Sequence, residues 1–230
     1  MVEHSAQKAI GHKFLPYEIK TEQNASILYS LGIGFQEDPL NEDHFRYTYE
    51  FADKFGPFPT WAVILAHSGK EIGMEKFNIP GVPEFNPMML LHGEESLFFE
   101  KHLEIGKTYK MQEFVSDFQD KGKGALLILD NEIRDAETNE LCVTVRMSLF
   151  IRGIGGFGYK GTIKTEYPKN PKRAPDMIKE EKTVKNQAFL YRLCSDSNPL
   201  HIDPQMAAMG GFEVPILHGL CFYGITARSI

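Results

Sequence analysis

Two side chains that commonly exchange protons stand close together near the end of the chain. Asp196 and His201 are five residues apart, and Pro199 lies between them. In a continuous helix, residues at this spacing point in different directions. Proline breaks a helix and pushes the residue before it, Asn198, toward an extended conformation. A turn of this kind can bring the carboxylate and the imidazole to one water molecule.

A water molecule shared by a carboxyl group and an imidazole indicates chemistry in which water is added. Hydration of a conjugated enoyl thioester needs a base for the water, an acid for the α-carbon and a donor for the developing enolate oxygen. Asp196 and His201 can perform the first two tasks. His218 and Gly219 begin a helix-like segment, and amides at a helix N-terminus lack partners within the helix. Because glycine allows close approach of a thioester oxygen, we predict the Gly219 N–H as the third group.

Three helices are expected to position these residues. Residues 183–194 predict a helix that leads into the turn. Asp203 followed by Pro204 is typical of the N-cap and first position of a short helix, which Gly210 ends. The apolar segment from His218 to the last residue predicts a final helix.

The first part of the chain predicts one helix followed by strands. Residues 17–33 have a helical apolar stripe, and residues 78–87 contain three prolines and predict a loop. Residues 108–119, 124–135 and 140–152 are rich in Val, Leu, Ile and Phe and are separated by turn residues. This pattern predicts an antiparallel meander.

Composition divides the chain into two units. Residues 1–152 form the predicted N-terminal unit, and residues 177–230 form a C-terminal unit with the Asp/His turn. Between them, residues 153–176 are rich in Gly, Pro and Lys, which is typical of a linker.

Two short segments recur in the same order in both units. Leu28–Leu31 resembles Leu190–Leu193, and Pro87–Gly93 resembles Pro215–Gly219. After the second segment the first unit continues through its strands, whereas the C-terminal unit reaches Ile230 within one helix. We therefore expect the second unit to be truncated, or a partner to supply its missing sheet.

Composition argues against several classes of protein. The net charge is −6 without a basic block, so nucleic-acid binding is not expected. No apolar run reaches the roughly 18 residues of a membrane span, and the N-terminus has no signal core. The three cysteines predict reduced thiols in the core of an intracellular protein. Ala227–Ile230 does not match a Ser-Lys-Leu peroxisomal address.

Segments along nearly the whole chain resemble one family, hydratase 2 of the MaoC-like hot-dog superfamily, as found in peroxisomal multifunctional enzymes. The similar segments are Tyr191–His201, Asn198–Pro204, Pro215–Cys221, the Gly-rich stretch Gly153–Gly158 and the turn Asp120–Gly122. An ordered match of this length is far more specific than a lone motif.

The resemblance implies an α+β fold of two hot-dog units, each a long helix wrapped by an antiparallel sheet, with the second unit incomplete. It implies reversible hydration of trans-2-enoyl-CoA to (3R)-3-hydroxyacyl-CoA in peroxisomal fatty acid β-oxidation. It further implies no metal or redox cofactor, an acyl-CoA substrate carried partly by the N-terminal unit, and a homodimer.

The resemblance also assigns roles to individual residues. Asp196 and His201 match the catalytic pair, with Asn198 and Gly219 beside them and Glu50 as an acidic residue of the first unit. The residues expected to contact the substrate are His92, Gly93, Lys121, Asp196, Ser197, Asn198, Pro199, Leu200, His201 and Gly219. One position departs from the pattern, because Ser195 stands where the family has glycine.

Each of these residues also has a simpler structural interpretation. Asp196 alone would be a helix-terminal cap, and His201 and His92 would be hydrogen-bonded structural histidines. Glu50 would be an exposed carboxylate and Lys121 a solvated lysine of a turn. Two other functions also stay open, a non-catalytic acyl-CoA binder and a thioesterase, since one fold hosts several activities.

Overall fold

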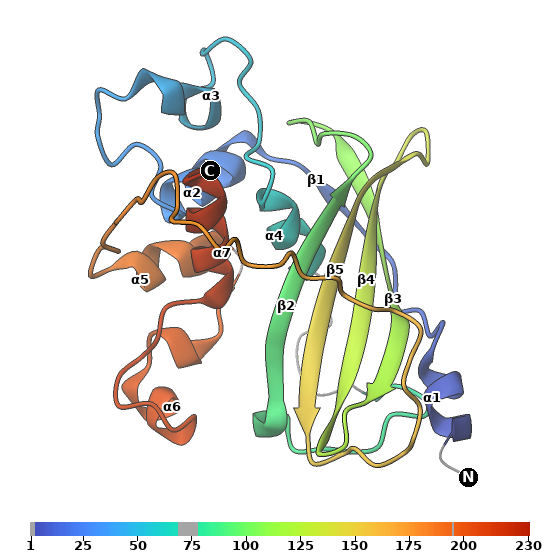
Figure 1. The fold of residues 1–230 in the computed structure, drawn as a ribbon. Helices are drawn as coiled ribbons and strands as arrows, with labels where there is room; N and C mark the ends of the chain where they lie inside the picture. The colour runs from blue at the N-terminus through green and yellow to red at the C-terminus, as the bar shows by residue number, and fades with distance from the viewer. Residues whose placement is uncertain (1–2, 69–77, 195) are drawn as a thin grey trace.

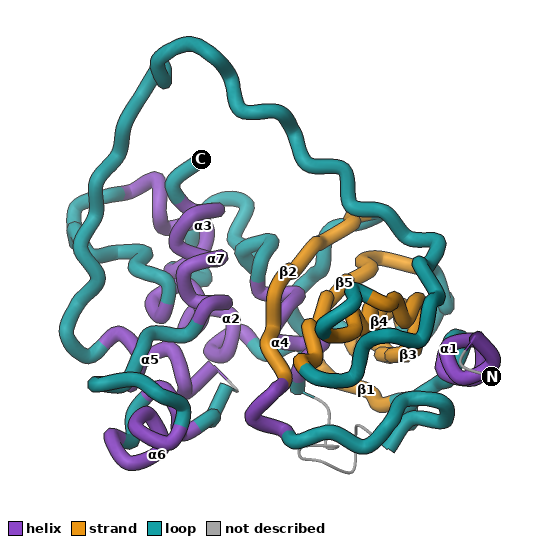
Figure 2. Tube along the Cα trace, turned by 60° about the horizontal axis from the view of Figure 1, so that its bottom comes forward, coloured by secondary structure: helices purple, strands orange, loops and turns teal. Residues whose placement is uncertain are grey.

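The computed structural model describes residues 3–68, 78–194 and 196–230. A five-stranded sheet stands beside a layer of helices (Figure 1), and a view turned by 60° shows the same division (Figure 2). The helices and strands are α1 (Glu3–Ala9), β1 (Tyr17–Lys20), α2 (Gln23–Gly32), α3 (Phe45–Thr48), α4 (Trp61–His67), β2 (Leu90–Phe99), β3 (Thr108–Asp120), β4 (Gly124–Asp135), β5 (Leu141–Arg152), α5 (Gln187–Tyr191), α6 (Pro204–Met209) and α7 (Gly219–Arg228). Short 3-10 helices are η1 (Glu42–His44), η3 (Pro87–Met89), η4 (Arg192–Cys194) and η5 (Pro199–His201).

The sheet is antiparallel, with the strand order β1-β3-β4-β5-β2. The predicted meander is confirmed as β3, β4 and β5, within one residue of the expected bounds. Strand β2 was not predicted, because His92-Gly93-Glu94-Glu95 interrupts its apolar pattern. The register with β5 shifts between His92 and Glu94, so Gly93 forms an irregularity in the strand.

The prediction of a single helix over residues 17–33 was wrong. Tyr17–Lys20 is the edge strand β1, and the helix begins only at Gln23. The side chains of Tyr17 and Ile19 pack on the core, while the alternate residues Glu18 and Lys20 are exposed. Thr21 then ends the strand, since its hydroxyl donates to the carbonyls of Glu104 and Lys107. The helix predicted over 183–194 likewise begins later, at Gln187.

Helix α4 fills the space between the sheet and the helical layer. Trp61 to Ala66 are all buried, and the helix contacts β4 and β5. The hydroxyl of Tyr17 donates to the carbonyls of Leu65 and Ala66 at 3.0 and 2.7 Å. Asn131 of β4 donates to the Ala66 carbonyl at 2.9 Å. These bonds satisfy carbonyls at the C-terminal end of a buried helix.

The recurring segments correspond to repeated structure only in part. Leu28–Leu31 and Leu190–Leu193 are both helical, and the rings of Tyr29 and Tyr191 pack with centroids 6.1 Å apart. The second pair differs, because His92-Gly93 lies in strand β2 whereas His218-Gly219 begins helix α7. The same His-Gly dipeptide therefore lies in a strand in the first unit and at the start of a helix in the second.

Helix α2 of the N-terminal segment belongs to the same layer as the C-terminal helices. It contacts α5 and η4, and Gln187 donates to the Gly32 carbonyl at 2.5 Å. Among residues 153–194 and 196–230 the structure has helices and loops but no strand. Several apolar side chains of this region are exposed: Phe189, Leu193, Met209, Val214 and Phe222.

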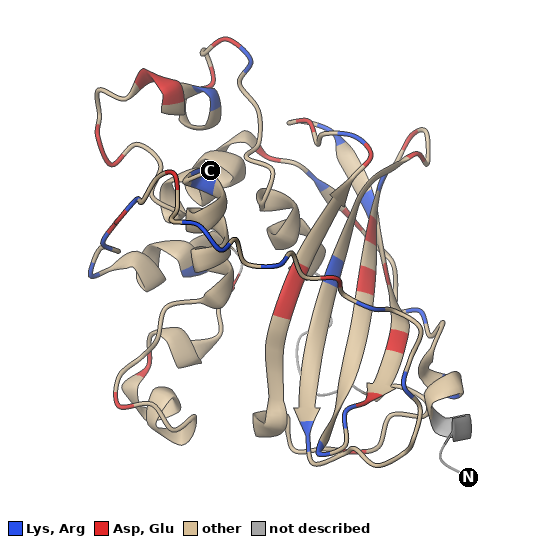
Figure 3. Cartoon of the chain, viewed as in Figure 1, with Lys and Arg blue, Asp and Glu red and all other residues tan. Residues whose placement is uncertain are grey.

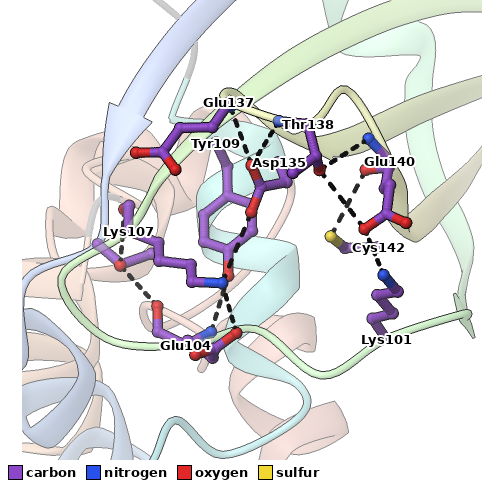
Figure 4. Close-up of polar contacts among 10 residues, drawn as sticks. Lys101, Glu104, Lys107, Tyr109, Asp135, Glu137, Thr138, Glu140 and Cys142 are labelled. Atoms are coloured by element: carbon purple, nitrogen blue, oxygen red, sulfur yellow. Dashed lines mark hydrogen bonds and ion pairs between the residues drawn. The ribbon is translucent and has the colours of Figure 1, made fainter.

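Charged side chains are spread over both layers. Figure 3 shows acidic and basic residues interspersed on the strands and loops. Figure 4 shows one polar group, in which Lys107 lies 2.7 Å from Glu104 and 3.6 Å from Asp135, and Lys101 pairs with Glu140. These exposed pairs join the loop before β3 to the β4–β5 turn, and such pairs add little to stability.

The first part of the predicted linker is held against strand β3 by two buried carboxylates. Asp120 accepts hydrogen bonds from the amides of Gly122, Gly156 and Gly158 at 2.7, 2.9 and 2.6 Å. Asp117 accepts from the amides of Thr162 and Ile163 at 2.7 and 2.8 Å. The chain from 156 to 163 therefore has a defined path along the sheet.

Replacing Asp120 with asparagine is expected to destabilise the fold, mainly above pH 4. The three amide donors lower the pKa of Asp120 to about 2. A carboxyl group with a lowered folded-state pKa stabilises the fold above its unfolded pKa, near 4, and loses that contribution as the pH falls toward 2. Thermal unfolding from pH 2 to 7 should show a lower Tm for the variant, with a gap that closes in acid. A gap independent of pH, or one shared by the exposed control Asp53→Asn, would contradict this.

Candidate active site

The turn that carries the candidate catalytic pair forms as predicted. Asn198 has φ −54° and ψ 118°, an extended conformation imposed by the following proline. Its side chain accepts a hydrogen bond from the Leu200 amide at 3.1 Å. The amide of Asn198 donates to the Asp196 carboxylate at 3.3 Å. Helix η5 then turns the chain so that His201 faces back toward Asp196.

Asp196, His201 and His218 come together at this turn. Each offers a ligand-type atom within 4.8 Å of the others. His201 Nδ1 lies 2.8 Å from the carbonyl oxygen of Ile216. Only a protonated nitrogen can donate to a carbonyl, so this contact places a proton on Nδ1, and Nε2 is the nitrogen that carries the lone pair when the ring is neutral. A neutral imidazole in this state is a base.

The side chain of His218 was not predicted to be part of the site. Its ring is buried, with a centroid 3.8 Å from that of His201. Its Nε2 lies 3.2 Å from the Asp196 carbonyl oxygen and 4.0 Å from the carboxylate. Burial, and then the neighbouring His201, lower the pKa of His218, which favours the neutral form of the ring. In the sequence, only the position of His218 immediately before Gly219 indicated that its side chain belongs to the site.

Gly219 is the first residue of α7, and His218 is its N-cap. The Gly219 amide belongs to the first turn of a ten-residue helix and therefore has no acceptor within that helix. A Cβ built at Gly219 would meet no atom within 4 Å, so the space in front of this residue is open. The predicted oxyanion donor thus belongs to an exposed residue that directly follows His218 of the Asp196, His201 and His218 cluster.

The other predicted residues do not join this cluster. Glu50 is exposed and follows α3, which lies at the opposite end of the helical layer from α6 (Figures 1 and 2). Lys121 is exposed in the β3–β4 turn, and Gly93 is in β2. Ser197 and Pro199 are exposed within the turn, where a substrate could reach them. Ser195, the departure from the family pattern, lies outside the described residues.

His92 belongs to a separate polar group. The buried Glu95 carboxylate lies 2.8 Å from His92 Nε2 and 3.2 Å from His67 Nε2. Burial opposes ionisation of Glu95, but the hydrogen bonds to the two imidazoles outweigh it and lower the pKa of Glu95. The ring of His92 is therefore engaged within the protein, and its predicted contact with substrate stays a prediction.

An apolar cavity of about 290 Å³ lies beside the helical layer. Its lining comes from the end of α2, the segment before and within α5, and Ile225 of α7. Neither Asp196 nor His201 lines it. This cavity therefore does not border the catalytic pair, and the expected contact of the acyl-CoA substrate with the N-terminal unit stays a prediction.

Comparison with known proteins supports the assignment of the fold. The family model described as the MFE-2 hydratase 2 N-terminal domain matches residues 19–153, and that of the MaoC-like domain matches residues 166–230. The crystal structure of a MaoC-like dehydratase from Phytophthora capsici superposes with a TM-score of 0.82 at 35% identity, over 97% of this chain and 76% of that one. Fold and turn together define a MaoC-like protein of hot-dog architecture.

Two curated relatives show which family of MaoC-like proteins the chain resembles. A probable enoyl-CoA hydratase 2 of Dictyostelium discoideum is 39% identical over 97% of this chain and 74% of its own length. The peroxisomal multifunctional enzyme type 2 of Mus musculus is 37% identical over 96% of this chain but only 30% of its own length. The chain therefore belongs to the hydratase 2 family. It spans about three quarters of one relative and less than a third of the other.

Proposed function

We propose that the protein is a (3R)-specific 2-enoyl-CoA hydratase, which adds water reversibly to trans-2-enoyl-CoA. The observation that carries this proposal is the meeting of Asp196 and His201 next to the first amide of α7. The hydratase names of the relatives support it.

The geometry suggests a division of labour. His201 Nε2, with its free lone pair, takes a proton from water, and the water oxygen bonds to the β-carbon of the enoyl group. The π electrons move onto the thioester oxygen, which the Gly219 N–H stabilises. The resulting His201 imidazolium passes this proton to the Asp196 carboxylate, which delivers it to the α-carbon. Both side chains thereby return to their starting states, so one water is added without net charge transfer.

The finer assignments rest on the relatives. We propose the (3R) product, a role in fatty acid β-oxidation and a peroxisomal location because similar proteins carry hydratase 2 and peroxisomal names. We also propose a homodimer, since β1 and β2 are sheet edges and apolar side chains of the C-terminal helices are exposed. No helix among the described residues is long and apolar enough to cross a membrane.

The proposal is tested by incubating the protein with trans-2-decenoyl-CoA. Loss of the enoyl thioester absorbance and release of the (3R)-hydroxy product, separated from its (3S) enantiomer by chiral chromatography, are expected. Folded protein that leaves the absorbance unchanged would contradict the hydratase proposal. A product of (3S) configuration would contradict the stereochemical part alone.

A second candidate function is binding of acyl-CoA without turnover. The observation that favours it is the absence of strands among the described residues after Arg152, so no sheet of the C-terminal unit packs on the helices around the turn. Calorimetric binding of decanoyl-CoA, combined with no conversion of the enoyl-CoA, would support this alternative. Turnover that Asp196→Asn abolishes would exclude it.

We propose that the reaction needs no metal, although the carboxylate and two imidazoles could hold a borderline cation. Dialysis against EDTA is expected to leave turnover unchanged. Added Zn²⁺ is expected to inhibit, because it would occupy the position that the water needs, and excess EDTA should reverse that inhibition. Loss of activity after dialysis, restored by Zn²⁺, would contradict this proposal.

A further inference from the structure

We propose, on the basis of the proposed function, that His218 is a positioning residue that joins the catalytic turn to the oxyanion-donor helix. It is 1% exposed and lies between Asp196, His201 and the start of α7. It contacts both members of the catalytic pair and directly precedes Gly219.

The first contact fixes the backbone of the acid. His218 Nε2 donates to the Asp196 carbonyl oxygen at 3.2 Å, and the Asp196 carboxylate lies 4.0 Å from the same nitrogen. The turn around Asp196 is otherwise held by a local bond, from the Asn198 amide to the carboxylate. The imidazole thus ties this turn to a distant part of the chain, because 22 residues separate the two partners.

The second contact fixes the base. The rings of His201 and His218 lie at an interplanar angle of 31° with centroids 3.8 Å apart. His201 also donates from Nδ1 to the Ile216 carbonyl. One side of the ring is therefore supported by an imidazole and its edge by a carbonyl, which leaves Nε2 as the free basic atom.

The unpaired Nδ1 of His218 indicates that the ring does more than fill space in the core. Its Nδ1 is buried and has no hydrogen-bond partner among the described residues, and neither has the hydroxyl of Tyr191, whose ring lies 5.0 Å away. A buried polar atom without a partner destabilises the fold. A phenyl ring would fill the same space without that penalty, so the imidazole is explained by its Nε2–H donor.

The surroundings keep His218 neutral. The charged or titratable groups that face it are His201, Asp196, Arg192 and the Tyr191 hydroxyl, whose pKa burial raises, and burial disfavours the charged form of His218. A neutral ring donates from Nε2 only, as the contact with the Asp196 carbonyl requires. A positive charge next to His201 would instead oppose protonation of the catalytic base.

Two variants remove the stacking contact and the hydrogen-bond donor of the His218 ring one at a time. His218→Gln keeps an amide donor near the position of Nε2 but loses the stacked ring, and His218→Phe keeps a ring but loses the donor. Each is expected to lower kcat while leaving KM nearly unchanged, because misplacing a catalytic group by 1 Å can cost about 10²-fold in rate. The matched control His102→Gln, at an exposed histidine on the loop before β3, should match the wild type.

Folded His218 variants with unchanged kcat, or with a change in KM alone, would overturn the proposal. A measurement that does not depend on turnover tests the positioning role of His218 even if the proposed hydratase function fails. Proton NMR of the wild-type chain should show a nuclear Overhauser effect between the rings of His201 and His218. The ring resonances of His201 should also move in any His218 variant that folds. Absence of the Overhauser effect would overturn the positioning role even if no hydratase activity is found.

Discussion

Replacement of Asp196 by asparagine is expected to lower kcat for hydration by about 10²- to 10⁴-fold, the range typical of a lost general acid or base. Asparagine fills the same space and can still accept the hydrogen bond from the Asn198 amide, so the turn should persist. It cannot deliver the proton to the α-carbon. Steady-state kinetics with an enoyl-CoA, together with a circular dichroism spectrum, measures both points.

The matched control is Asp53→Asn, at an exposed carboxylate in the loop between α3 and α4. This variant should retain the activity of the wild type. Equal activity of Asp196→Asn and the control would remove Asp196 from the mechanism. A fall in activity accompanied by loss of the folded spectrum would instead assign Asp196 the role of a cap.

Replacement of Gly219 by proline is expected to lower kcat by about 10²- to 10³-fold, as for loss of one oxyanion donor. Proline removes the amide hydrogen at this position and puts a ring carbon on the nitrogen in its place. It is favoured as the first residue of a helix, and His218 already has the extended backbone, φ −55° and ψ 131°, that a following proline requires. A side chain here also meets open space.

Gly219→Ala is the control for this experiment, because alanine keeps the amide and its Cβ has no neighbour within 4 Å. The alanine variant should retain most of the activity of the wild type. If the alanine and proline variants lose activity equally, the site needs the absence of a side chain rather than the N–H. If neither loses activity, the oxyanion donor lies elsewhere.

Local patterns predicted much of the fold. The meander β3–β5 was found because long apolar runs end at clear turns, and α6 because Asp203 and Pro204 start it. Strand β1 was missed because its four residues continue into the apolar stripe of α2. Only pairing with the distant strand β3 distinguishes that segment from a helix.

The site was predictable to the extent that it is local. Pro199 fixes the turn, so the approach of His201 to Asp196 followed from the six residues 196–201. The part played by His218 depends on how α7 packs against the turn, and no spacing in the sequence encodes that. Glu50 illustrates the converse, because the resemblance gave it a role but the fold places it after α3, away from the cluster.

A crystal structure with bound (3R)-3-hydroxydecanoyl-CoA tests the central geometry most directly. The account predicts the 3-hydroxyl oxygen within hydrogen-bond distance of both Asp196 and His201 Nε2, and the thioester oxygen at the Gly219 amide. A ligand whose hydroxyl contacts neither side chain, or whose thioester oxygen points away from the start of α7, would contradict it.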